Sequence, residues 1–206
     1  MNDLHINARN QGGVLTAQLS AKEINGELSW QPDGEGKLVA RLKNLTLGQP
    51  ESWLSSANDT GKKEEVARLP SLGDDASATE FPALDLKVDD LSWKDKQLGK
   101  MELLARQHGS DWQLEHMHIT NPDGVLTAHG IYRMAEGKSQ TQVNLKLEIT
   151  DAGKILSRSG YPDSVKDGSG TLEGEFTWRG GPDDFSYATL DGNLKLDTDK
   201  GQFSEN

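Results

Sequence analysis

The stretch Val143-Asn144-Leu145-Lys146-Leu147-Glu148-Ile149 alternates strictly between apolar and polar side chains. Successive side chains of a β-strand point to opposite sides, so this pattern predicts a strand with one apolar and one polar side. A strand buried on both sides would read as a near-continuous apolar run, and the sequence contains no such run. The stretch therefore predicts a sheet that has one side in water.

The same alternation recurs along most of the chain. It is found in residues 4–8, 15–19, 24–30, 38–47, 84–93, 101–105, 112–114, 126–130, 172–178 and 190–196. Within 84–93 it changes phase after Val88, so that Leu91 and Trp93 continue it. Asn, Asp and Gly separate these stretches, as in residues 122–124, and they suit tight hairpins. The sequence predicts a mainly β protein whose antiparallel sheet is extended strand by strand.

Two segments depart from this pattern. Residues 48–80 are rich in Ser, Asp, Glu, Gly and Lys, which predicts a flexible insertion or linker between the strands of 1–47 and those of 81–206, or else a partly helical crossover. Residues 151–159 predict one short helix, with Thr150 or Asp151 as its N-cap and Gly160 after its end. A helix this short needs a packing partner, and we expect it to cover an edge of the sheet.

Short sequence repeats indicate that the sheet grew by duplication. The pattern Asn-x-x-Gly-Val-Leu-Thr-Ala occurs at 10–17 and again at 121–128. Strand ends of the type acidic-apolar-Ser/Thr-Trp occur at 27–30, 90–93 and 175–178. Their tryptophans either close a core or line the rim of an apolar groove, where an amphipathic ring suits the boundary with water.

Composition and charge exclude several classes of protein. The chain has 22 Lys and Arg against 33 Asp and Glu, a net charge of −11. A surface this acidic repels nucleic acid. The absence of Cys rules out disulfides and thiolate metal sites. Met1 is followed by neither a leader nor an apolar span, and the chain stops just after a strand-like stretch, so we expect a piece of a longer protein.

No catalytic motif is found. The sequence lacks a phosphate-binding Gly-rich loop, a Gly-x-Ser-x-Gly elbow and a His-Glu-x-x-His helix. His116 and His118 are spaced to share one strand side, which could hold a metal, but solvated histidines are the favoured interpretation because no third ligand lies at motif spacing. We expect a protein that is not an enzyme and needs no cofactor or metal.

The second half of the chain resembles the C-terminal region of the YhdP family of AsmA-like proteins. The residues that carry the resemblance are Phe81–Leu86, Leu91-Ser92-Trp93, Trp112-x-Leu114, Ile119–Asp123, Gly160–Asp163, Gly168-x-Gly170-x-Leu172-x-Gly174, Trp178-x-Gly180-x-Pro182-x-x-Phe185, Leu190-x-Gly192-x-Leu194-x-Leu196 and Gly201-x-Phe203. Their order over 81–203 is more specific than any one of them.

The resemblance implies a bridge-like lipid transfer protein, in which an extended, curled antiparallel β-sheet forms an open groove. Such a protein would be anchored in the inner membrane of a Gram-negative bacterium, cross the periplasm and carry phospholipid toward the outer membrane, whose barrier it supports. Phospholipid acyl chains would contact the inward side chains, Leu38, Leu42, Leu86, Val88, Leu103, Leu126, Val143, Leu145, Leu147, Leu172, Phe176, Leu194 and Leu196. The alternative is a closed β-sandwich, a scaffold or protein-interaction module of the cell envelope. Exposed edge strands would also allow self-association.

Overall fold

A computed structural model describes residues 4–48, 81–135, 138–158, 161, 165–182, 184–185 and 187–203. These described residues form eleven strands, one short helix and one 3-10 turn. In order they are β1 (His5–Gln11), β2 (Val14–Ser20), β3 (Ile24–Gln31), β4 (Lys37–Leu47), β5 (Ala83–Trp93), β6 (Lys96–His108), β7 (Asp111–Asn121), β8 (Gly124–Ala135), β9 (Lys138–Ile149), α2 (Ala152–Arg158), β10 (Val165–Arg179), η1 (Tyr187–Thr189) and β11 (Asp191–Phe203). The predicted mainly β class is confirmed; the prediction of a flexible insertion concerns residues that lie almost entirely outside the described ones.

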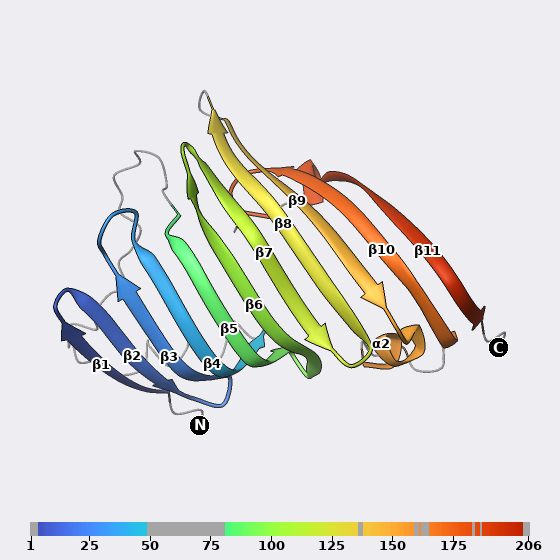
Figure 1. The fold of residues 1–206 in the computed structure, drawn as a ribbon, viewed down its shortest axis with the longest axis horizontal. Coiled ribbons are helices and arrows are strands. Elements are labelled where there is room, and N and C mark those ends of the chain that lie inside the picture. The colour runs from blue at the N-terminus through green and yellow to red at the C-terminus, as the bar shows by residue number, and fades with distance from the viewer. Residues whose placement is uncertain are drawn as a thin grey trace.

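All eleven strands belong to one sheet and lie in chain order from β1 to β11. Figure 1 shows them side by side in a single curved layer, with the N- and C-terminal strands at its opposite ends. Among the described strands, β1 and β11 each have one neighbour, so the sheet is open. A closed β-sandwich would need a second sheet to cover the first, and this alternative is therefore wrong for the described residues.

One pair of strands departs from the predicted antiparallel order. β4 and β5 are parallel, with Lys37 opposite Ala83 and Leu47 opposite Trp93, whereas the other neighbours are antiparallel. A parallel pair cannot be joined by a hairpin, because the chain must return to the end where the first strand began. Residues 48–82 make this return. Their length therefore indicated a crossover connection, and the sheet is mixed.

Register shifts keep the apolar side chains on one side where the alternation changes phase. One shift lies between Val88 and Leu91 in β5, and another lies between Leu114 and Met117 in β7. A β-bulge inserts an extra residue and so resets which side the following residues face. The predicted phase change in 84–93 is confirmed. The shift in β7 also places His116 on the polar side, opposite Leu104.

The two copies of the Asn-x-x-Gly repeat both form hairpins, but their turns differ by one position. In the first hairpin Gln11 pairs with Val14, and in the second Asn121 pairs with Gly124. The first turn is made by residues 12–13, two glycines with φ of 60° and 88°. Two consecutive positive φ angles are the geometry of a tight hairpin turn. Similar sequence therefore gives the same kind of element with a different local register.

Helix α2 confirms the predicted short helix, and Asp151 caps it. The Asp151 carboxylate accepts a hydrogen bond from the backbone N–H of Lys154 at 2.9 Å and pairs with the Lys154 ammonium, also at 2.9 Å. These contacts, the side-chain one first, lower the pKa of Asp151 below its ordinary value of 3.8. A short helix gains much of its local stability from such a cap.

The helix covers one end of the apolar side rather than a hydrogen-bonding edge of the sheet. Ile155 lies against Gly124 of β8, whose missing side chain leaves room for it. Arg158 pairs with the buried carboxylate of Asp123, with Nε 2.8 Å from Oδ2. The Asp123 carbonyl accepts the N–H of Thr150 at 2.9 Å. The expectation that the helix protects a strand edge is wrong, because β9 and β10 are paired on both of their sides.

Candidate functional site: an apolar track across the sheet

Three rows of cross-strand partners run across the whole sheet on its apolar side. The first row is Ile6, Leu19, Gly26, Leu42, Val88, Met101, Ile119, Leu126, Leu147, Leu172 and Leu196. The second is Ala8, Ala17, Leu28, Ala40, Leu86, Leu103, Met117, Ala128, Leu145, Gly174 and Leu194. The third is Asn10, Leu15, Trp30, Leu38, Leu84, Ala105, Leu114, Gly130, Val143, Phe176 and Gly192. We call these rows together the apolar track.

The track is continuous because directly opposed residues of neighbouring strands point to the same side of a sheet. Asn10, in the edge strand β1, is its single member with a polar side chain. At about 4.8 Å between strands, eleven strands carry it over roughly 48 Å. All thirteen side chains that the sequence predicts for a lipid groove belong to it. The register adds the small members, such as Ala8, Ala17 and Ala128, which one strand read alone does not distinguish.

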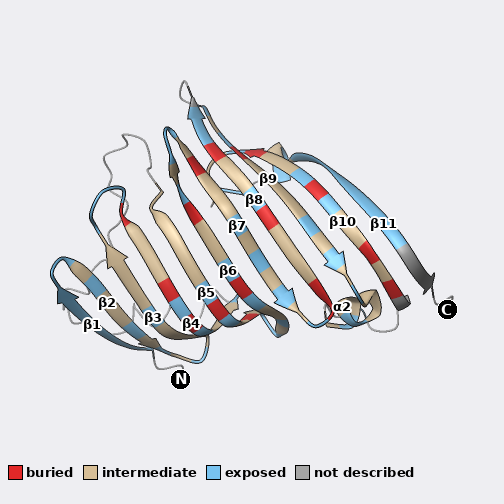
Figure 2. Ribbon diagram, viewed as in Figure 1, coloured by how far each residue is buried: buried red, intermediate tan, exposed pale blue. Residues whose placement is uncertain are grey.

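Burial falls from the middle of the track to its ends. Ala40, Val88 and Leu91 are at most 2% exposed and form one cluster with Leu42 and Met101. In the edge strands, by contrast, the exposed fraction is about 60% for Ile6 of β1 and for Leu194 and Leu196 of β11. Figure 2 shows the same trend, with buried positions on the inner strands and mostly exposed positions on β1 and β11. The apolar surface at both ends of the track is therefore left without a neighbouring strand.

Aromatic side chains close the track where β7 and β9 begin and β8 and β10 end. Phe81 packs against Trp112 and Tyr132, with ring centroids 5.5 and 5.2 Å apart. The indole N–H of Trp112 donates to the Pro82 carbonyl at 3.0 Å, which satisfies its one polar group. At this end of the strands the aromatic rings act as core, since Trp112 and Tyr132 are both under 9% exposed.

The repeated tryptophans divide between the two predicted roles. Trp178 is buried, and its N–H donates to the Gly181 carbonyl at 2.9 Å. Trp93 is 51% exposed at the end of β5. Core closure therefore describes Trp178, and a position at the boundary with water describes Trp93.

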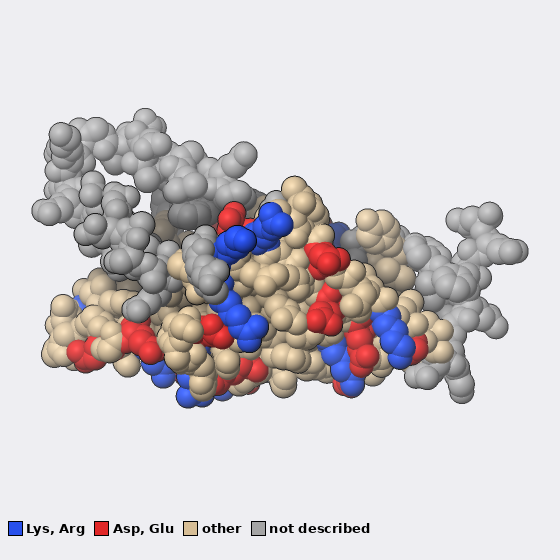
Figure 3. All heavy atoms as spheres, turned by 90° about the horizontal axis from the view of Figure 1, so that it is seen from above, with Lys and Arg blue, Asp and Glu red and all other residues tan. Residues whose placement is uncertain are grey.

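The opposite side of the sheet is polar, and several of its charges form ion pairs. Lys87 and Glu102 are cross-strand partners 3.1 Å apart, and Arg41 reaches Asp85 at 2.8 Å. Gln142 donates to Glu175 at 2.8 Å. Figure 3 shows Lys, Arg, Asp and Glu interspersed along the lower margin of the described residues. Mixed signs on one side and apolar rows on the other define a sheet with two distinct surfaces.

A close ion pair between Arg106 and Glu115 predicts a pH dependence. Glu115 accepts hydrogen bonds from Arg106, with Nε and Oε1 2.6 Å apart, and lies 3.3 Å from His108. The Arg106 guanidinium is the main reason that the pKa of Glu115 lies below its ordinary value of 4.5. A carboxyl whose pKa is lowered by folding stabilises the fold above that ordinary value, and the stabilisation is lost as the pH falls through the lowered pKa.

We therefore expect NMR titration to give a Glu115 pKa below 4.5, and the variant Arg106→Gln to raise it toward that value. The difference in unfolding free energy between the wild type and Glu115→Gln should shrink as the pH is lowered through this range. An unchanged Glu115 pKa in Arg106→Gln would contradict the assignment. His108 serves as a check, since its replacement by Gln should shift the Glu115 pKa less than loss of Arg106 does.

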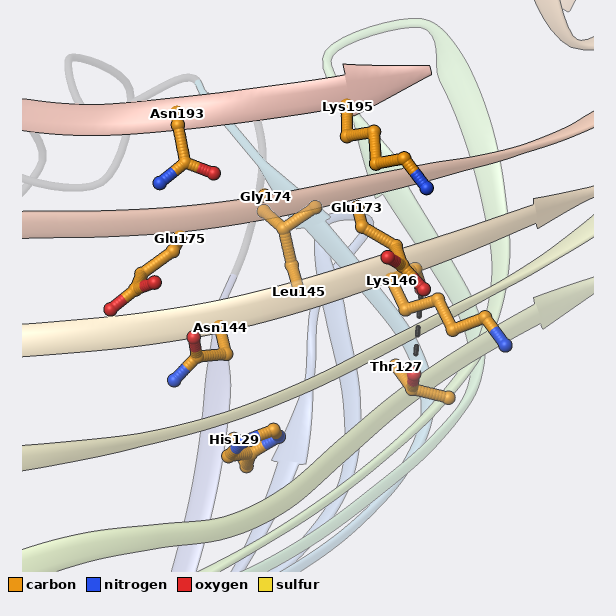
Figure 4. A pocket seen from close by; sticks show the side chains of 10 residues that line it. All are labelled: Thr127, His129, Asn144, Leu145, Lys146, Glu173, Gly174, Glu175, Asn193 and Lys195. Carbon is orange, nitrogen blue, oxygen red and sulfur yellow. Dashed lines mark hydrogen bonds between the residues drawn. The ribbon is translucent and has the colours of Figure 1, made fainter. Parts of the chain in front are cut away.

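A shallow cavity of about 460 Å³ lies on the polar side, over β8 to β11. Figure 4 shows its lining side chains, among them His129, Lys146, Glu173 and Lys195. Thr127 donates to the Lys146 carbonyl at 3.4 Å in its wall. Leu145 and Gly174 of the track also line the cavity. The other lining residues face the polar side and mix both charge signs with amides, so the cavity is a hollow of the solvated surface.

The histidine pair shows no metal-binding arrangement. The rings of His116 and His118 lie 5.6 Å apart on the polar side, as the spacing predicts. Within the described residues, no group of three or more His, Asp or Glu side chains could hold a metal ion. Nor does the described part of the chain contain a helix long and apolar enough to cross a membrane.

These features define a class of protein: an open, single-layered β-sheet with a continuous apolar track on one side and a charged, polar surface on the other. The chain belongs to the YhdP protein family, whose model matches residues 1–206. The match extends the predicted resemblance from residues 81–203 to the whole chain. No curated protein and no solved structure matches it.

Proposed function

We propose that the chain is a section of a phospholipid-conducting sheet in the envelope of a Gram-negative bacterium. Acyl chains lie on the apolar track while head groups remain in water. The section belongs to the periplasmic part of an inner-membrane-anchored protein that moves phospholipid between the inner and outer membranes and supports the barrier of the outer membrane. The observation that carries the proposal is the continuity of the three apolar rows across all eleven strands.

The physical argument concerns what covers this surface. A contiguous apolar area on a single layer is unfavourable in water unless a partner buries it. Each methylene of an acyl chain that leaves water contributes about 0.8 kcal/mol. Because the apolar rows are uninterrupted, the track can accept an acyl chain at any position along its length. Movement along the track needs no bond to be made or broken, which agrees with a protein that is not an enzyme.

A second proposal, a protein-interaction module, rests on the two edges of the sheet, which have no neighbouring strand among the described residues. β1 and β11 each offer a row of free backbone groups to another strand. The exposed Leu194 and Leu196 extend the apolar surface up to one of these edges. Edge pairing with a second copy would bury this surface without any lipid.

Photo-crosslinking in the full-length protein in cells tests both proposals. A photo-reactive residue at Leu145, on the track, is expected to capture phospholipid. The same residue at Lys146, the next position and on the polar side, is the matched control and should capture at least tenfold less. Equal capture from both positions, or capture of protein in place of lipid from Leu145, would contradict transport and favour the interaction module.

A further inference from the structure

Two glycines of the track lie beneath one phenylalanine ring. Gly174 of β10 and Gly192 of β11 occupy track positions where most other members carry larger side chains. A β-carbon built on Gly174 would lie 2.8 Å from Cε2 and 3.3 Å from Cζ of Phe176, and one built on Gly192 would lie 2.8 Å from Cδ1. One side of the Phe176 ring therefore lies above Gly192, its cross-strand partner, and the other lies above Gly174 on its own strand.

This arrangement requires that the ring lie along the sheet rather than stand on it. A phenylalanine in a strand ordinarily projects roughly perpendicular to the sheet. Here the absence of two β-carbons leaves a space into which the ring folds down. Phe176 is half-buried with no second layer of strands among the described residues, so one face of its ring contacts glycine backbone and the other faces the open side.

We propose that Gly174 and Phe176 form a positioning pair at the β10–β11 end of the track. Gly174 lets the Phe176 ring lie flat, which leaves room for an acyl chain to pass over it. The inference rests on the proposed function and adds a depth-setting element to it. The same glycine–aromatic device occurs at Trp30 and Gly36, where a β-carbon would also meet the indole. At Phe176, however, both glycines are themselves members of the three rows, whereas Gly36 is not.

Gly174 is the position at which the idea can be tested without distorting the backbone. A β-carbon at Gly192 would collide with the Glu175 carbonyl, so a side chain there would disturb the sheet itself. At Gly174 the nearest atoms are side-chain atoms alone, those of Phe176 and Cδ2 of Leu194 at 3.0 Å. Gly174→Val should therefore lift the ring into the path of the acyl chain and leave the strand paired.

The experiment uses full-length protein with a photo-reactive residue at Val143, the cross-strand neighbour of Phe176, or at the distant and exposed track position Leu15. Gly174→Val is expected to reduce phospholipid capture from Val143 at least tenfold and to leave capture from Leu15 within twofold. Phe176→Leu in the same chain, which removes the lifted ring, should restore capture from Val143. Glu173→Val, which adds the same side chain on the polar side, should have no effect.

Each other outcome overturns the inference. Unchanged capture from Val143 in Gly174→Val would show that the ring does not limit the track. A loss that Phe176→Leu does not reverse, that Glu173→Val reproduces, or that extends to Leu15 would assign the effect to the sheet as a whole. Failure of the proposed function is distinguishable from these results, because then the wild-type protein would capture no phospholipid from either position.

Discussion

Leu91→Ala is expected to lower the free energy of unfolding by about 2–5 kcal/mol, the range for truncating a fully buried leucine. Leu91 is 1% exposed and lies in the cluster with Val88 and Met101, where the sheet is most tightly packed. Its removal leaves a cavity that the paired backbone of β4, β5 and β6 cannot collapse to fill. For a chain of this size the midpoint of thermal unfolding should fall by about 2–4 °C for each kcal/mol.

The matched control is Leu194→Ala in β11. Leu194 is 60% exposed, so the same truncation should change the unfolding free energy by no more than about 0.5 kcal/mol. Urea unfolding followed by tryptophan fluorescence measures both variants. Similar effects at the two positions would contradict the view that the apolar side is packed at its centre and open at its end, and would indicate a covered β11.

Leu145→Asp is expected to reduce phospholipid transport by the full-length protein at least tenfold. Leu145 belongs to the second row of the track, opposite Ala128 and Gly174. An acyl chain on this position would have to bury a carboxylate that has no partner, at a cost of several kcal/mol. Since every chain moving along the track must cross β9, one charged position is sufficient to interrupt a continuous apolar row. The measurement is the rate of lipid delivery to the outer membrane, with sensitivity to detergent as its cellular counterpart.

Asn144→Asp adds the same charge one residue away and controls for changes in net charge. Asn144 faces the polar side beside Glu175 and Gln142, where an added carboxylate stays solvated. Transport by this variant should match the wild type, and both proteins should accumulate to similar levels. Normal transport in Leu145→Asp, with the protein folded, would remove the track from the mechanism.

The division of each strand into an apolar and a polar side follows from the sequence alone. A period of two leaves no freedom about which residues share a side, so all predicted groove residues lie on the track. The sequence also shows the change of phase after Val88, because the β-bulge there keeps the later apolar residues on the same side of the sheet. Helix α2 could also be predicted from local sequence, since the Asp151 side chain caps the helix by accepting the backbone N–H of Lys154.

The order and direction of strand pairing were decided by the tertiary structure. Nothing in the alternation of β4 or β5 distinguishes a parallel neighbour from an antiparallel one, because the side chains show the same period in both. The length of residues 48–82 was the available signal, and it is equally compatible with a linker. The same limit applies to the sandwich alternative, since one sheet and two sheets can share a strand pattern.

The sequence by itself therefore determined that this chain is a β protein with an apolar and a polar side. The tertiary structure alone decided that its apolar residues join into uninterrupted rows, because continuity depends on cross-strand register, which is a relation between residues far apart in the chain. It also decided that Phe176 lies flat, since this requires Gly174 on its own strand and Gly192 on the next one to be beneath it together.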